Sequence, residues 1–422
     1  MELTRLKGFQ DLLGPQARTL AHVEDRARVL MQRYAVGEIR IPLLERIELY
    51  QRSTGETSDI VSKQMYTFTD RDEAGTTLAL RPEGTPGVVR AYIEAGLDRS
   101  DPEQRFFYSG PMFRRERPQK GRYRQFYQFG VEVFGRADPA CDAELLVMID
   151  DLRRDLGLEF QFEINSLGCP KCRPAFRAAV LDYGRLHFLE LCRDCHERLE
   201  RNPLRLLDCK IDVKLAEQAP RSLDFLCEEC RKHFDDVKQF LSRQAVPFVV
   251  KPNLVRGLDY YTRTAFEVVS AAVGAQSAIA AGGRYDGLVK ELGGASVPGT
   301  GFAIGIERTA LALQASEFKS DAHPRVALVG LGDQGNLAAM SLAHDLRERD
   351  LPVEFLPTDR KLKAALTIAS RMGADFIVII GENEMARGVV QLRDLRTSTQ
   401  REVARDEVAE AIGTAAEVPH PA

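Results

Sequence analysis

The spacing of apolar residues predicts helices and strands along the first part of the chain. Residues 16–36 carry apolar side chains at helical spacing, namely Leu20, Val23, Ala27, Leu30 and Met31, which predicts an amphipathic helix. Residues 38–42 and 76–80 predict short strands. Two longer strands, at 104–116 and 124–134, are separated by a segment rich in turn formers, so we expect a β-hairpin with a long loop.

The pattern changes at residue 169. From there the chain becomes helical, charged and cysteine-bearing, which predicts an inserted helical domain at 169–246 within a core domain formed by 1–168 and 247–320. Charged and small residues at 316–324 predict a linker. Apolar runs then alternate with helical patterns over 324–418, which predicts a small α/β domain with a largely parallel sheet.

The composition fits a folded protein with several domains. A length of 422 residues corresponds to about two to four domains, and the 44% apolar and 28% charged residues exclude a disordered chain. The net charge of −4 argues against a globally basic, nucleic-acid-coating protein but leaves room for local basic patches. The chain has no run of about 18 apolar residues and its start lacks the layout of a signal peptide, so we expect a cytoplasmic protein without a transmembrane helix.

The eight cysteines are clustered along the chain. Six of them form three Cys-x-x-Cys pairs, at Cys169/Cys172, Cys192/Cys195 and Cys227/Cys230, and Cys141 and Cys209 are single. In a cytosolic chain this clustering favours metal ligands or inert thiols over disulfides. The spacing between the first two pairs is typical of zinc sites, so Cys169, Cys172, Cys192 and Cys195 are candidate ligands of a structural zinc ion, with Cys209, Cys227 and Cys230 as further candidates.

The loop of the predicted hairpin is strongly basic. Between Arg114 and Arg124 it carries six basic residues and one acidic residue, Glu116. Neighbouring positions on a hairpin can direct several guanidinium groups at one volume, and these groups bind phosphate bidentately and stay charged. A phosphate-binding loop and an ordinary solvated charged loop both fit this run of charges.

The strand after the loop favours the first reading. Its alternation puts five residues on one face, namely Phe126, Gln128, Gly130, Glu132 and Phe134, and Tyr127, Phe129, Val131 and Val133 on an apolar face. Two polar side chains around a glycine suit a ligand pocket better than a core. We therefore expect a phosphate clamp beside a polar pocket, with Phe126 as a stacking surface for a base.

Three further segments carry candidate chemistry. In Arg81-Pro82-Glu83-Gly84-Thr85, Glu83 could hold an ammonium group and Thr85 could add a hydroxyl, although an ordinary turn would also explain the motif. Tyr260-Tyr261 and the glycine-rich 281–287 could line a pocket, or could be packed turns. The segment 299–308 is neither a dinucleotide fingerprint nor a lysine-containing phosphate loop, and it brings an arginine, Arg308, to the start of a helix.

Together these segments resemble the class II aminoacyl-tRNA synthetases, and within that class the histidyl-tRNA synthetase family. Phe113-Arg114-Arg115-Glu116 is similar to the second motif of the class, and 301–308 to the third. Residues 80–85, 254–261 and 281–288 resemble stretches specific to the histidine family. The resemblance covers nearly the whole chain. One departure is Tyr34-Ala35-Val36-Gly37, where the family more often has a Tyr-Gly-Tyr-like run, beside the first motif and away from catalytic positions.

The resemblance implies a fold and an assembly. It implies an α/β protein with an α+β catalytic core, in which helices flank an antiparallel β-sheet, a helical insertion domain and a C-terminal α/β anticodon-binding domain. It also implies a homodimer formed through the first motif, at about 38–48, and no contact with membranes.

The implied reaction has two steps: histidine and ATP form histidyl-adenylate, and the histidyl group then moves to the terminal adenosine of tRNA(His). Mg²⁺ would accompany ATP. No histidine or cysteine nucleophile is needed, because the substrate carboxylate attacks, so the protein contributes positioning and electrostatics.

The resemblance also implies roles for individual residues. Arg114, Arg256 and Arg308 would be catalytic, and Arg256 would reach the α-phosphate, a role that a metal ion often fills. ATP would be bound by Arg114, Glu116, Arg122, Phe126 and Arg308. Histidine would be bound by Glu83, Gly84, Thr85, Arg114, Gln128, Glu132, Arg256, Tyr260, Tyr261 and Tyr285.

Contacts with tRNA are expected at two places. Within the loop of the second motif, Arg117 and Gln119 are the candidates for contact with the acceptor end. In the C-terminal domain the candidates are basic residues, namely Arg360, Lys361, Lys363, Arg371, Arg387, Arg393 and Arg396.

One alternative function stays open at this point. Some synthetase-like proteins keep this catalytic fold as a histidine-sensing regulatory subunit of ATP phosphoribosyltransferase. Those proteins lack the anticodon-binding domain, whereas this chain has a C-terminal α/β pattern and keeps Arg114, Arg256 and Arg308.

Overall fold

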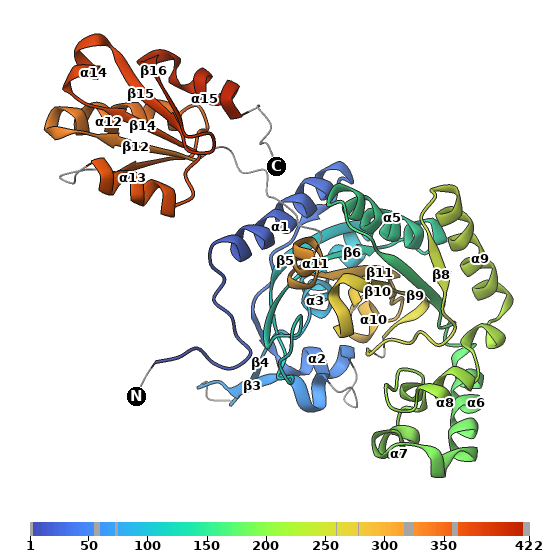
Figure 1. The fold of residues 1–422 in the computed structure, drawn as a ribbon. Coiled ribbons are helices and arrows are strands. Elements are labelled where there is room, and N and C mark those ends of the chain that lie inside the picture. Colours follow the sequence, from blue (N-terminus) through green and yellow to red (C-terminus); the bar gives the residue numbers. More distant parts are fainter. Residues whose placement is uncertain are drawn as a thin grey trace. The chain divides into compact units, whose positions relative to one another are not determined.

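The computed structural model describes residues 3–54, 60–71, 75–258, 260–276, 278–315, 325–356 and 362–416. The chain forms two compact units, Met1–Phe318 and Lys319–Ala422, which are coloured blue to orange and orange to red in Figure 1. The predicted linker at 316–324 lies outside the described residues.

An eight-stranded sheet organises the first unit. Its strand order is β1-β5-β6-β11-β10-β9-β7-β8, and all neighbours pair antiparallel except β1 with β5 and β7 with β8. The strands are β1 (Gly37–Glu38), β5 (Gln104–Phe113), β6 (Gln125–Phe134), β7 (Gln161–Ser166), β8 (Phe248–Val250), β9 (Thr262–Val269), β10 (Ala278–Arg284) and β11 (Gly299–Gly305). The predicted antiparallel sheet with flanking helices is confirmed.

The strand predicted at 38–42 is much shorter in the structure. β1 ends at Glu38, and the backbone N–H of Ile39 still donates to the carbonyl of Phe107 over 2.8 Å. Beyond this point the carbonyl of Ile41 accepts from the Arg81 guanidinium, over 2.7 Å, and not from a strand. Pro42 has no N–H to continue a ladder, so the segment leaves the sheet there.

Two sets of elements cover the two faces of this sheet. On one face the core is built from α1 (Pro15–Arg33), α5 (Pro139–Asp155), α9 (Glu228–Arg243) and α11 (Ile306–Ala315). The other face is covered by α2 (Ile47–Thr54), α3 (Thr85–Glu94), α4 (Leu97–Ser100), α10 (Leu288–Glu291) and a small sheet in the order β2-β4-β3. The small sheet consists of β2 (Leu44–Arg46), β3 (Tyr66–Thr69) and β4 (Thr77–Leu80).

The alternation predicted for β6 is confirmed. Phe129, Val131 and Val133 belong to the apolar core beneath α1, α5 and α11. Phe134 belongs to the second apolar cluster, together with Tyr108 and Tyr285. The polar positions of β6 therefore face the side of the sheet that carries the tyrosines.

The segment between β7 and β8 is helical, as expected from its pattern. Its helices are α6 (Arg173–Leu186), α7 (Arg193–Leu199), α8 (Val213–Gln218) and α9, with short 3-10 turns at Phe188–Glu190, Pro203–Leu206 and Ser222–Phe225. Phe234, Val237 and Leu241 repeat at helical spacing on α9 and are buried in the main core. In Figure 1, α6, α7 and α8 form a group beside the sheet, whereas α9 runs along it.

The second unit is a five-stranded sheet with helices. It contains β12 (Val326–Gly330), α12 (Gly332–Arg347), β13 (Val353–Leu356), α13 (Leu362–Arg371), β14 (Phe376–Ile380), α14 (Glu382–Arg387), β15 (Val389–Asp394), β16 (Thr399–Ala404) and α15 (Val408–Ala416). The strand order is β13-β12-β14-β15-β16. α12 and α15 pack on one face and α13 packs on the other.

The sheet of this unit is less parallel than predicted. β13, β12 and β14 are parallel, but β15 and β16 pair antiparallel. A parallel crossover needs about a dozen residues or more, and the connection from β14 to β15 holds only the six-residue helix α14. The strand β16 and the helix α15 had no clear signal in the sequence, because their residues are mostly polar or alanine.

The remaining helical turns of the first unit lie at Ile60–Gln64 and Ala271–Gln276, and a last one lies at Arg405–Glu407 in the second unit. Of the helices that the structure describes, none has both the length and the apolar character needed to span a membrane.

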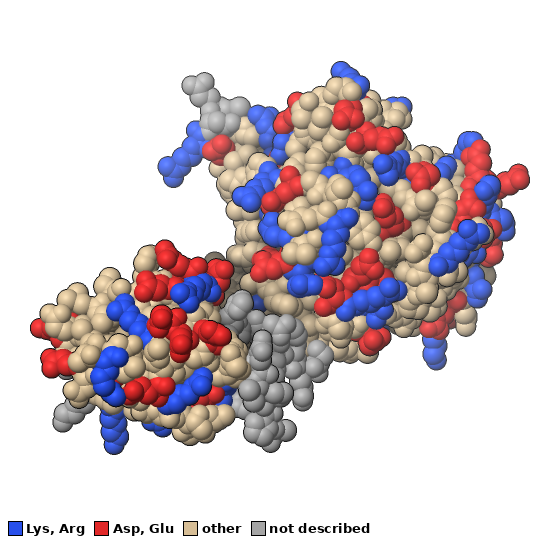
Figure 2. Space-filling view, turned by 90° about the horizontal axis from the view of Figure 1, so that it is seen from above, with Lys and Arg blue, Asp and Glu red and all other residues tan. Residues whose placement is uncertain are grey.

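On the face shown in Figure 2, basic and acidic side chains of the described residues are interspersed on both units, as the small net charge leads one to expect.

Candidate active site

A cavity opens on the tyrosine-bearing side of the large sheet. Strands β5, β6, β9, β10 and β11 and the loops before Thr85 and Tyr260 contribute to its wall. At the arginine end lie Arg114, Glu116, Arg122 and Arg308, and at the tyrosine end lie Glu83, Thr85, Tyr260, Tyr261 and Tyr285. Most of the predicted ligand-binding residues, which the sequence spreads from Glu83 to Arg308, therefore meet at one cavity.

Arg114 is fixed where β5 ends. The backbone N–H of Phe113 donates to the carbonyl of Arg81 over 2.9 Å, which ties the strand end to the loop of Glu83. The Arg114 Nε then donates to the carbonyl of Pro82 over 2.9 Å. Its guanidinium carbon lies 5.3 Å from the centre of the Phe126 ring, within cation–π range. Arg114 and Phe126 thus form one surface of the cavity.

The other arginines surround a single carboxylate. Arg122 donates from Nε to Oε2 of Glu116, and a backbone bridge between Gln119 and Arg122 closes the loop. Arg308 donates to the carbonyls of Gly121 and Ala278, over 2.8 and 2.7 Å. Glu116 is the carboxylate nearest to these arginines, and Glu267, which also acts on Arg308, is paired with Arg256, so positive charge remains in excess.

The pKa shifts at the arginine end report this excess. Burial lowers the pKa of Arg308, and the positive charges of Arg114 and Arg122 lower it further. Burial would raise the pKa of Glu116, but the hydrogen bond from Arg122 and the nearby arginine charges outweigh it and lower the pKa. An anionic ligand would relieve the repulsion among the arginines.

The tyrosine end is buried and hydrogen-bonded. Glu83 is 5% exposed, and its carboxylate accepts from the hydroxyls of Thr54, over 3.2 Å, and Tyr260, over 3.0 Å. Burial raises the pKa of Glu83, against the lowering effect of Arg114 and Arg256. The ring of Tyr260 packs 4.7 Å from that of Tyr261 and edge-on to that of Tyr285, at 5.8 Å.

Glu132 and Gly84 lie behind the cavity wall and do not line it, unlike the other predicted histidine-binding residues. Glu132 is 1% exposed and accepts from the hydroxyl of Thr85 over 2.6 Å and from that of Tyr285. A Cβ on Gly301 would come within 2.0 Å of the Glu132 carboxylate, and one on Gly84 within 2.3 Å of the Tyr108 ring. Glycine at these two positions lets the buried groups sit directly behind the wall.

Arg256 and its partner Glu267 lie in the cavity wall between the two ends. Its Nη1 lies 2.5 Å from Oε1 of Glu267, and its guanidinium carbon lies 5.3 Å from the centre of the Tyr261 ring. The charge of Arg256 lowers the pKa of Glu83, and the charge of Glu267 favours the protonated form of Arg308. Arg256 is thus a cation within the cavity wall that acts on the tyrosine end directly, and its partner Glu267 acts on the arginine end.

Gln128 offers an unused polar group to the cavity. The register of β6 pairs Gln128 with Gly110 on one side and Gly305 on the other, so its side chain stands between two glycines. Within the described residues, its Oε1 is buried and has no hydrogen-bond partner. A buried acceptor without a partner costs about 1–3 kcal/mol, which a polar ligand in the cavity would offset.

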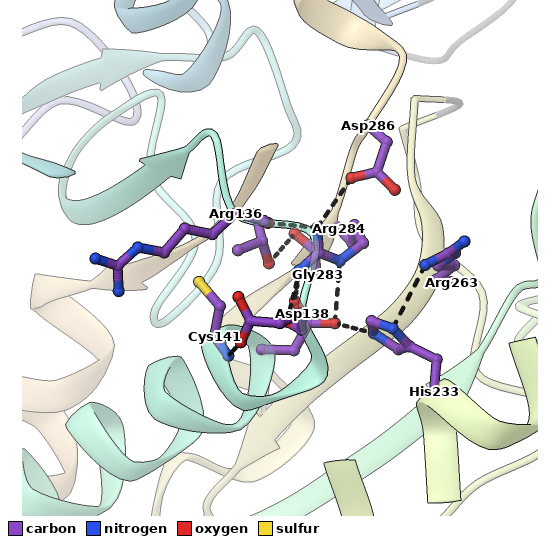
Figure 3. A network of polar contacts seen from close by, with 10 residues as sticks. Arg136, Asp138, Cys141, His233, Arg263, Gly283, Arg284 and Asp286 are labelled. Atoms are coloured by element: carbon purple, nitrogen blue, oxygen red, sulfur yellow. Dashed lines mark hydrogen bonds and ion pairs between the residues drawn. The ribbon is translucent and has the colours of Figure 1, made fainter. Parts of the chain in front are cut away.

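A buried ionic network holds the strand end that carries Tyr285. Arg284 is fully buried and ion-paired with Asp142 over 2.6 Å and Asp286 over 3.0 Å. His233 of α9 lies 2.8 Å from the same Asp142, and Arg284 also donates to the carbonyls of Arg136 and Asp138 (Figure 3). Burial would raise the pKa of Asp142, but Arg284 and His233 lower it. The network joins α5, α9 and β10 behind the cavity.

The predicted tRNA contacts differ in exposure. Arg117 and Gln119 are exposed on the hairpin loop and do not line the cavity. In the second unit, Lys363, Arg371 and Arg387 are exposed, whereas Arg360 and Lys361 lie outside the described residues.

Arg396 is engaged inside the second unit. It donates to Asp394 over 2.8 Å and to the carbonyl of Ala415 over 2.7 Å, and it packs over the Phe376 ring. Its side chain is therefore occupied by contacts within the unit.

The structure divides the four candidate zinc ligands between two clusters. Cys169 and Cys172 lie with Cys227 and Cys230, and Cys192 and Cys195 lie with Cys209 and Asp212. The single site expected from spacing is therefore replaced by two groups. The reason is that the start of α9 lies beside the start of α6, which brings the third Cys-x-x-Cys pair next to the first, and linear spacing does not reveal this.

The sequence patterns predict no role for four further residues of the cavity. Tyr108, Tyr123, Glu267 and Glu307 also line the cavity. Glu307 accepts the backbone N–H of Tyr127 with both oxygens, at 2.9 and 3.0 Å, and burial raises its pKa to about 7. The signal for Glu267 in the sequence is a lone acidic residue within the apolar half of its strand, at 265–269.

Comparison with known proteins identifies the family. The profile for "Histidyl-tRNA synthetase" matches residues 8–169 and 191–309, and that for "Anticodon binding domain" matches residues 325–414. The chain belongs to the histidyl-tRNA synthetase family. The resemblance inferred from the motifs is therefore confirmed, and so is an anticodon-binding domain in the second unit.

Relatives of this synthetase family match along nearly the full length. The histidine–tRNA ligase of Desulforamulus reducens is 45% identical over 413 residues, which are 97% of this chain and 98% of that protein. That of Thermotoga maritima is 46% identical over 416 residues, 98% of each. A crystal structure of the apo histidyl-tRNA synthetase of S. aureus is 33% identical, with a TM-score of 0.79, and covers 97% of this chain and 100% of that one.

Proposed function

We propose that this chain is a histidine–tRNA ligase. It activates histidine with ATP to give histidyl-adenylate, and then transfers histidine to the 3′-terminal adenosine of tRNA(His). One observation carries this proposal: a single cavity joins a guanidinium cluster with excess positive charge to a buried pocket of tyrosines and carboxylates. Relatives of this family are histidine–tRNA ligases.

ATP fits the arginine end. The chemistry of the donor set suits a triphosphate, because guanidinium groups bind phosphate bidentately and remain charged. In this proposal Arg114 holds the α-phosphate, Arg122 and Arg308 hold the distal phosphates, and Glu116 and Phe126 flank the adenine. ATP enters with Mg²⁺, which would neutralise charge on the phosphates.

Histidine fits the tyrosine end. The ammonium group donates to Glu83 and to the partnerless Oε1 of Gln128. The imidazole lies against Tyr260, Tyr261 and Tyr285, and Thr85 adds a hydroxyl to the wall. Gly84 and Glu132 act from behind the wall, because they fix Tyr108, Thr85 and Tyr285.

The chemistry runs between the two ends. A carboxylate oxygen of histidine attacks the α-phosphorus, the bond between this phosphorus and the α,β-bridging oxygen breaks, and pyrophosphate leaves with the electron pair of that bond. Arg114 and Arg256 stabilise the charge that develops on the α-phosphoryl oxygens, as fixed cations in a site of low dielectric. In the second step the ribose hydroxyl of tRNA attacks the carbonyl carbon of histidyl-adenylate. The bond between this carbon and the oxygen that bridges to phosphorus breaks, AMP leaves with that electron pair, and the hydroxyl proton passes to the departing phosphate.

The same proposal covers the rest of the molecule. Residues 1–168 and 247–320 form the catalytic core, 169–246 the insertion domain and 324–418 the anticodon-binding domain. Arg117 and Gln119 on the exposed hairpin loop contact the acceptor end, and the exposed Lys363, Arg371 and Arg387 contact the anticodon. The protein acts in the cytoplasm, away from membranes.

Two copies associate through 38–48. The exposed apolar side chains of Leu43 and Leu44, each 43% exposed, support this interface.

The regulatory alternative has less support. By the resemblance, the histidine-sensing subunits lack an anticodon-binding domain, whereas residues 325–414 match that domain. The arginines required for the reaction are present and converge on the cavity.

The test is ATP–pyrophosphate exchange with each of the twenty amino acids, followed by aminoacylation of tRNA(His). We expect exchange with histidine alone and formation of histidyl-tRNA. Equal exchange with another amino acid, or histidine binding without exchange, would contradict the proposal. Co-purification with a phosphoribosyltransferase together with no exchange would favour the regulatory alternative.

A further inference from the structure

Two groups of metal-ligating side chains lie in the helical segment between β7 and β8, away from the cavity. We call Cys169, Cys172, Cys227 and Cys230 the neck cluster, and Cys192, Cys195, Cys209 and Asp212 the outer cluster. Within each cluster the four candidate ligand atoms all lie within 4.8 Å of one another. Four ligand atoms in so small a volume match the coordination number of zinc in structural sites.

The sulfur spacing in the neck cluster fits a tetrahedral metal site. Sγ of Cys169 lies 3.6 Å from Sγ of Cys172 and 4.0 Å from Sγ of Cys227. A disulfide needs about 2.05 Å, so these thiols are not bonded in pairs. With a Zn–S bond of about 2.3 Å, the edge of a tetrahedron is about 3.8 Å long. The observed spacings lie on both sides of that value.

The surroundings of the neck cluster favour thiolates. Cys172 is the N-cap of α6 and Cys227 is the N-cap of α9. The partial positive charge at both helix N-termini stabilises negative sulfur. The backbone N–H of Cys227 also donates to Sγ of Cys172 over 3.2 Å, and such outer donors orient metal ligands.

The outer cluster is built from three cysteines and a carboxylate. Sγ of Cys192 lies 3.8 Å from Sγ of Cys209, which lies 3.6 Å from Oδ2 of Asp212. The Asp212 carboxylate accepts the backbone N–H of Cys192, over 3.0 and 3.1 Å. The backbone of Cys192 thus fixes the orientation of the Asp212 carboxylate, and Oδ2 of Asp212 remains close to Sγ of Cys209.

The structure around the outer cluster has short helices and few buried apolar residues. The helices α7 and α8 have seven and six residues, which is too short for helices that are stable on their own. Besides Cys195, the buried apolar residues around them are Leu191, Leu199 and Leu206, and α8 itself buries only Ala216. So small an apolar cluster supplies little stability, and small modules of this kind commonly rely on a metal ion.

The neck cluster lies where the chain leaves and re-enters the core. Cys169 follows β7 closely, and Cys227 begins α9, whose apolar face is buried in the main core. The helix α6 in turn packs by Phe176 against the loop of Arg256, in a small cleft that Arg173 and Arg205 also line. A metal at the neck would therefore fix the helices that back the Arg256 loop.

We propose that this segment holds two structural zinc ions, one bound by the four cysteines of the neck cluster and one by the three cysteines and Asp212 of the outer cluster. Soft thiolate ligands in tetrahedral arrangement select zinc over hard cations such as Mg²⁺. Iron is the other metal that a four-sulfur site accepts. The ions are structural, because all four ligand positions come from the protein.

The first measurement is the metal content of the purified full-length chain, expressed with zinc in the medium. We expect about two zinc ions per chain, with sulfur scatterers at about 2.3 Å in X-ray absorption. Absence of metal, or zinc with an oxygen- and nitrogen-dominated shell, would overturn the proposal. Iron in place of zinc would overturn the choice of metal.

Matched variants assign the two sites. Cys230→Ser should remove about one zinc per chain and Cys209→Ser about one other. Cys141→Ser is the control, because Cys141 is buried and belongs to neither cluster, and it should keep both ions. If neither cluster variant changes the zinc content, the sites are wrong, and if only Cys230→Ser does, the outer site is wrong.

Zinc release from the wild-type chain tests the proposal without relying on variants that could misfold. A mercurial that modifies thiols should free two zinc ions per chain, detected with a colorimetric chelator, in step with thiol modification. Thiol titration of the unfolded, metal-free chain should give all eight cysteines, whereas disulfides would lower that number and contradict the proposal. These readouts do not depend on exchange activity, so they can fail while the proposed ligase function stands.

Discussion

The two ends of the cavity are held together by different forces. At the arginine end, Arg122 and Arg308 are fixed by one carboxylate and by backbone carbonyls, and positive charge remains in excess. At the tyrosine end, Glu83 and Glu132 are almost fully buried and accept hydrogen bonds from tyrosine and threonine hydroxyls. One end is incomplete without an anion, and the other is largely complete before any ligand arrives.

This difference indicates how each end recognises its ligand. Excess charge in a partly exposed site attracts phosphates strongly but distinguishes poorly among them. A buried site that is built to hydrogen-bond its ligand rejects analogues that leave its polar groups unpaired. Selection of the amino acid is therefore expected at the tyrosine end, and charge stabilisation during the reaction at the arginine end and at Arg256.

The largest effect is expected for Arg256→Ala, because Arg256 is the cavity-wall cation that is proposed to lie beside the reacting α-phosphate. Removal of a fixed cation beside the reacting phosphoryl group should lower the kcat of histidine-dependent exchange by about 10²–10³-fold, with a much smaller change in histidine binding. Steady-state exchange kinetics measure both quantities. Arg99→Ala, at an exposed arginine, is the control. An unchanged kcat would remove Arg256 from the mechanism.

The next effect is expected for Glu83→Gln. The amide is nearly isosteric but loses the charge that meets the histidine ammonium, so KM for histidine should rise by about 10–100-fold. KM for ATP should stay within about twofold, because Glu83 belongs to the tyrosine end. Exchange assays with each substrate varied in turn give both values. Equal increases in the two KM values would show that the ends are not separate.

Glu132 predicts a dependence of stability on pH. Burial raises the pKa of Glu132 to about 8, from 4.5. Between these values the folded chain holds a proton that the unfolded chain has lost. This group therefore makes the free energy of unfolding fall as pH rises from about 4.5 to about 8, by up to about 1.4 kcal/mol per pH unit.

The comparison of wild type with Glu132→Gln isolates this contribution. The glutamine variant does not titrate, so its unfolding free energy should decline less across the same pH window, measured by chemical denaturation. Parallel pH profiles for the two proteins would mean that Glu132 is ionised in the folded chain. Tyr285→Phe, which removes the hydroxyl donor but keeps the carboxylate, should retain the wild-type slope.

A smaller effect is expected for Arg122→Ala. Arg122 is one of three guanidinium groups at its end, so its loss should raise KM for ATP by about 5–10-fold and leave KM for histidine nearly unchanged. The rise in KM for ATP should become smaller as ionic strength increases, because salt screens the attraction between the guanidinium groups of the arginine end and the phosphates. An equal rise in KM for histidine would contradict the claim that the two ends bind ATP and histidine separately.

The smallest effect is expected for Arg117→Ala. This residue is exposed and lies outside the cavity, so exchange without tRNA should keep its rate. Aminoacylation of tRNA(His) should slow by about two- to threefold, as expected for the loss of one exposed phosphate contact. A matching loss in exchange would place Arg117 in the first step and not in tRNA binding.

Part of the site could be predicted from alternation and motifs. The period of two along β6 separates Phe129, Val131 and Val133 from Gln128 and Glu132, and the structure agrees. Alternation gives the face of a strand but not the depth behind a cavity wall. Glu132 accepts hydrogen bonds from Thr85 and Tyr285, and these three residues come from separate segments of the chain. No local sequence pattern predicts this contact.

Other features depend on distant pairings. The cysteine spacing indicates metal ligands, but the position of the start of α9 beside the start of α6 decides which pairs meet. Glu267 joins the site because β9 brings it to Arg256. In the second unit, the short helix α14 turns the sheet antiparallel, where alternating strands and helices suggested a parallel sheet. Connection lengths and long-range pairing carry this information, and hydrophobic periodicity does not.

The most direct test of the two-ended cavity is a crystal structure of the chain with histidine and an unreactive ATP analogue bound. The account predicts the histidine ammonium at the Glu83 carboxylate and Gln128 Oε1, with the phosphates at Arg114, Arg122 and Arg308 and the α-phosphate beside Arg256. Phosphates at the tyrosine end, or histidine bound outside it, would contradict the account.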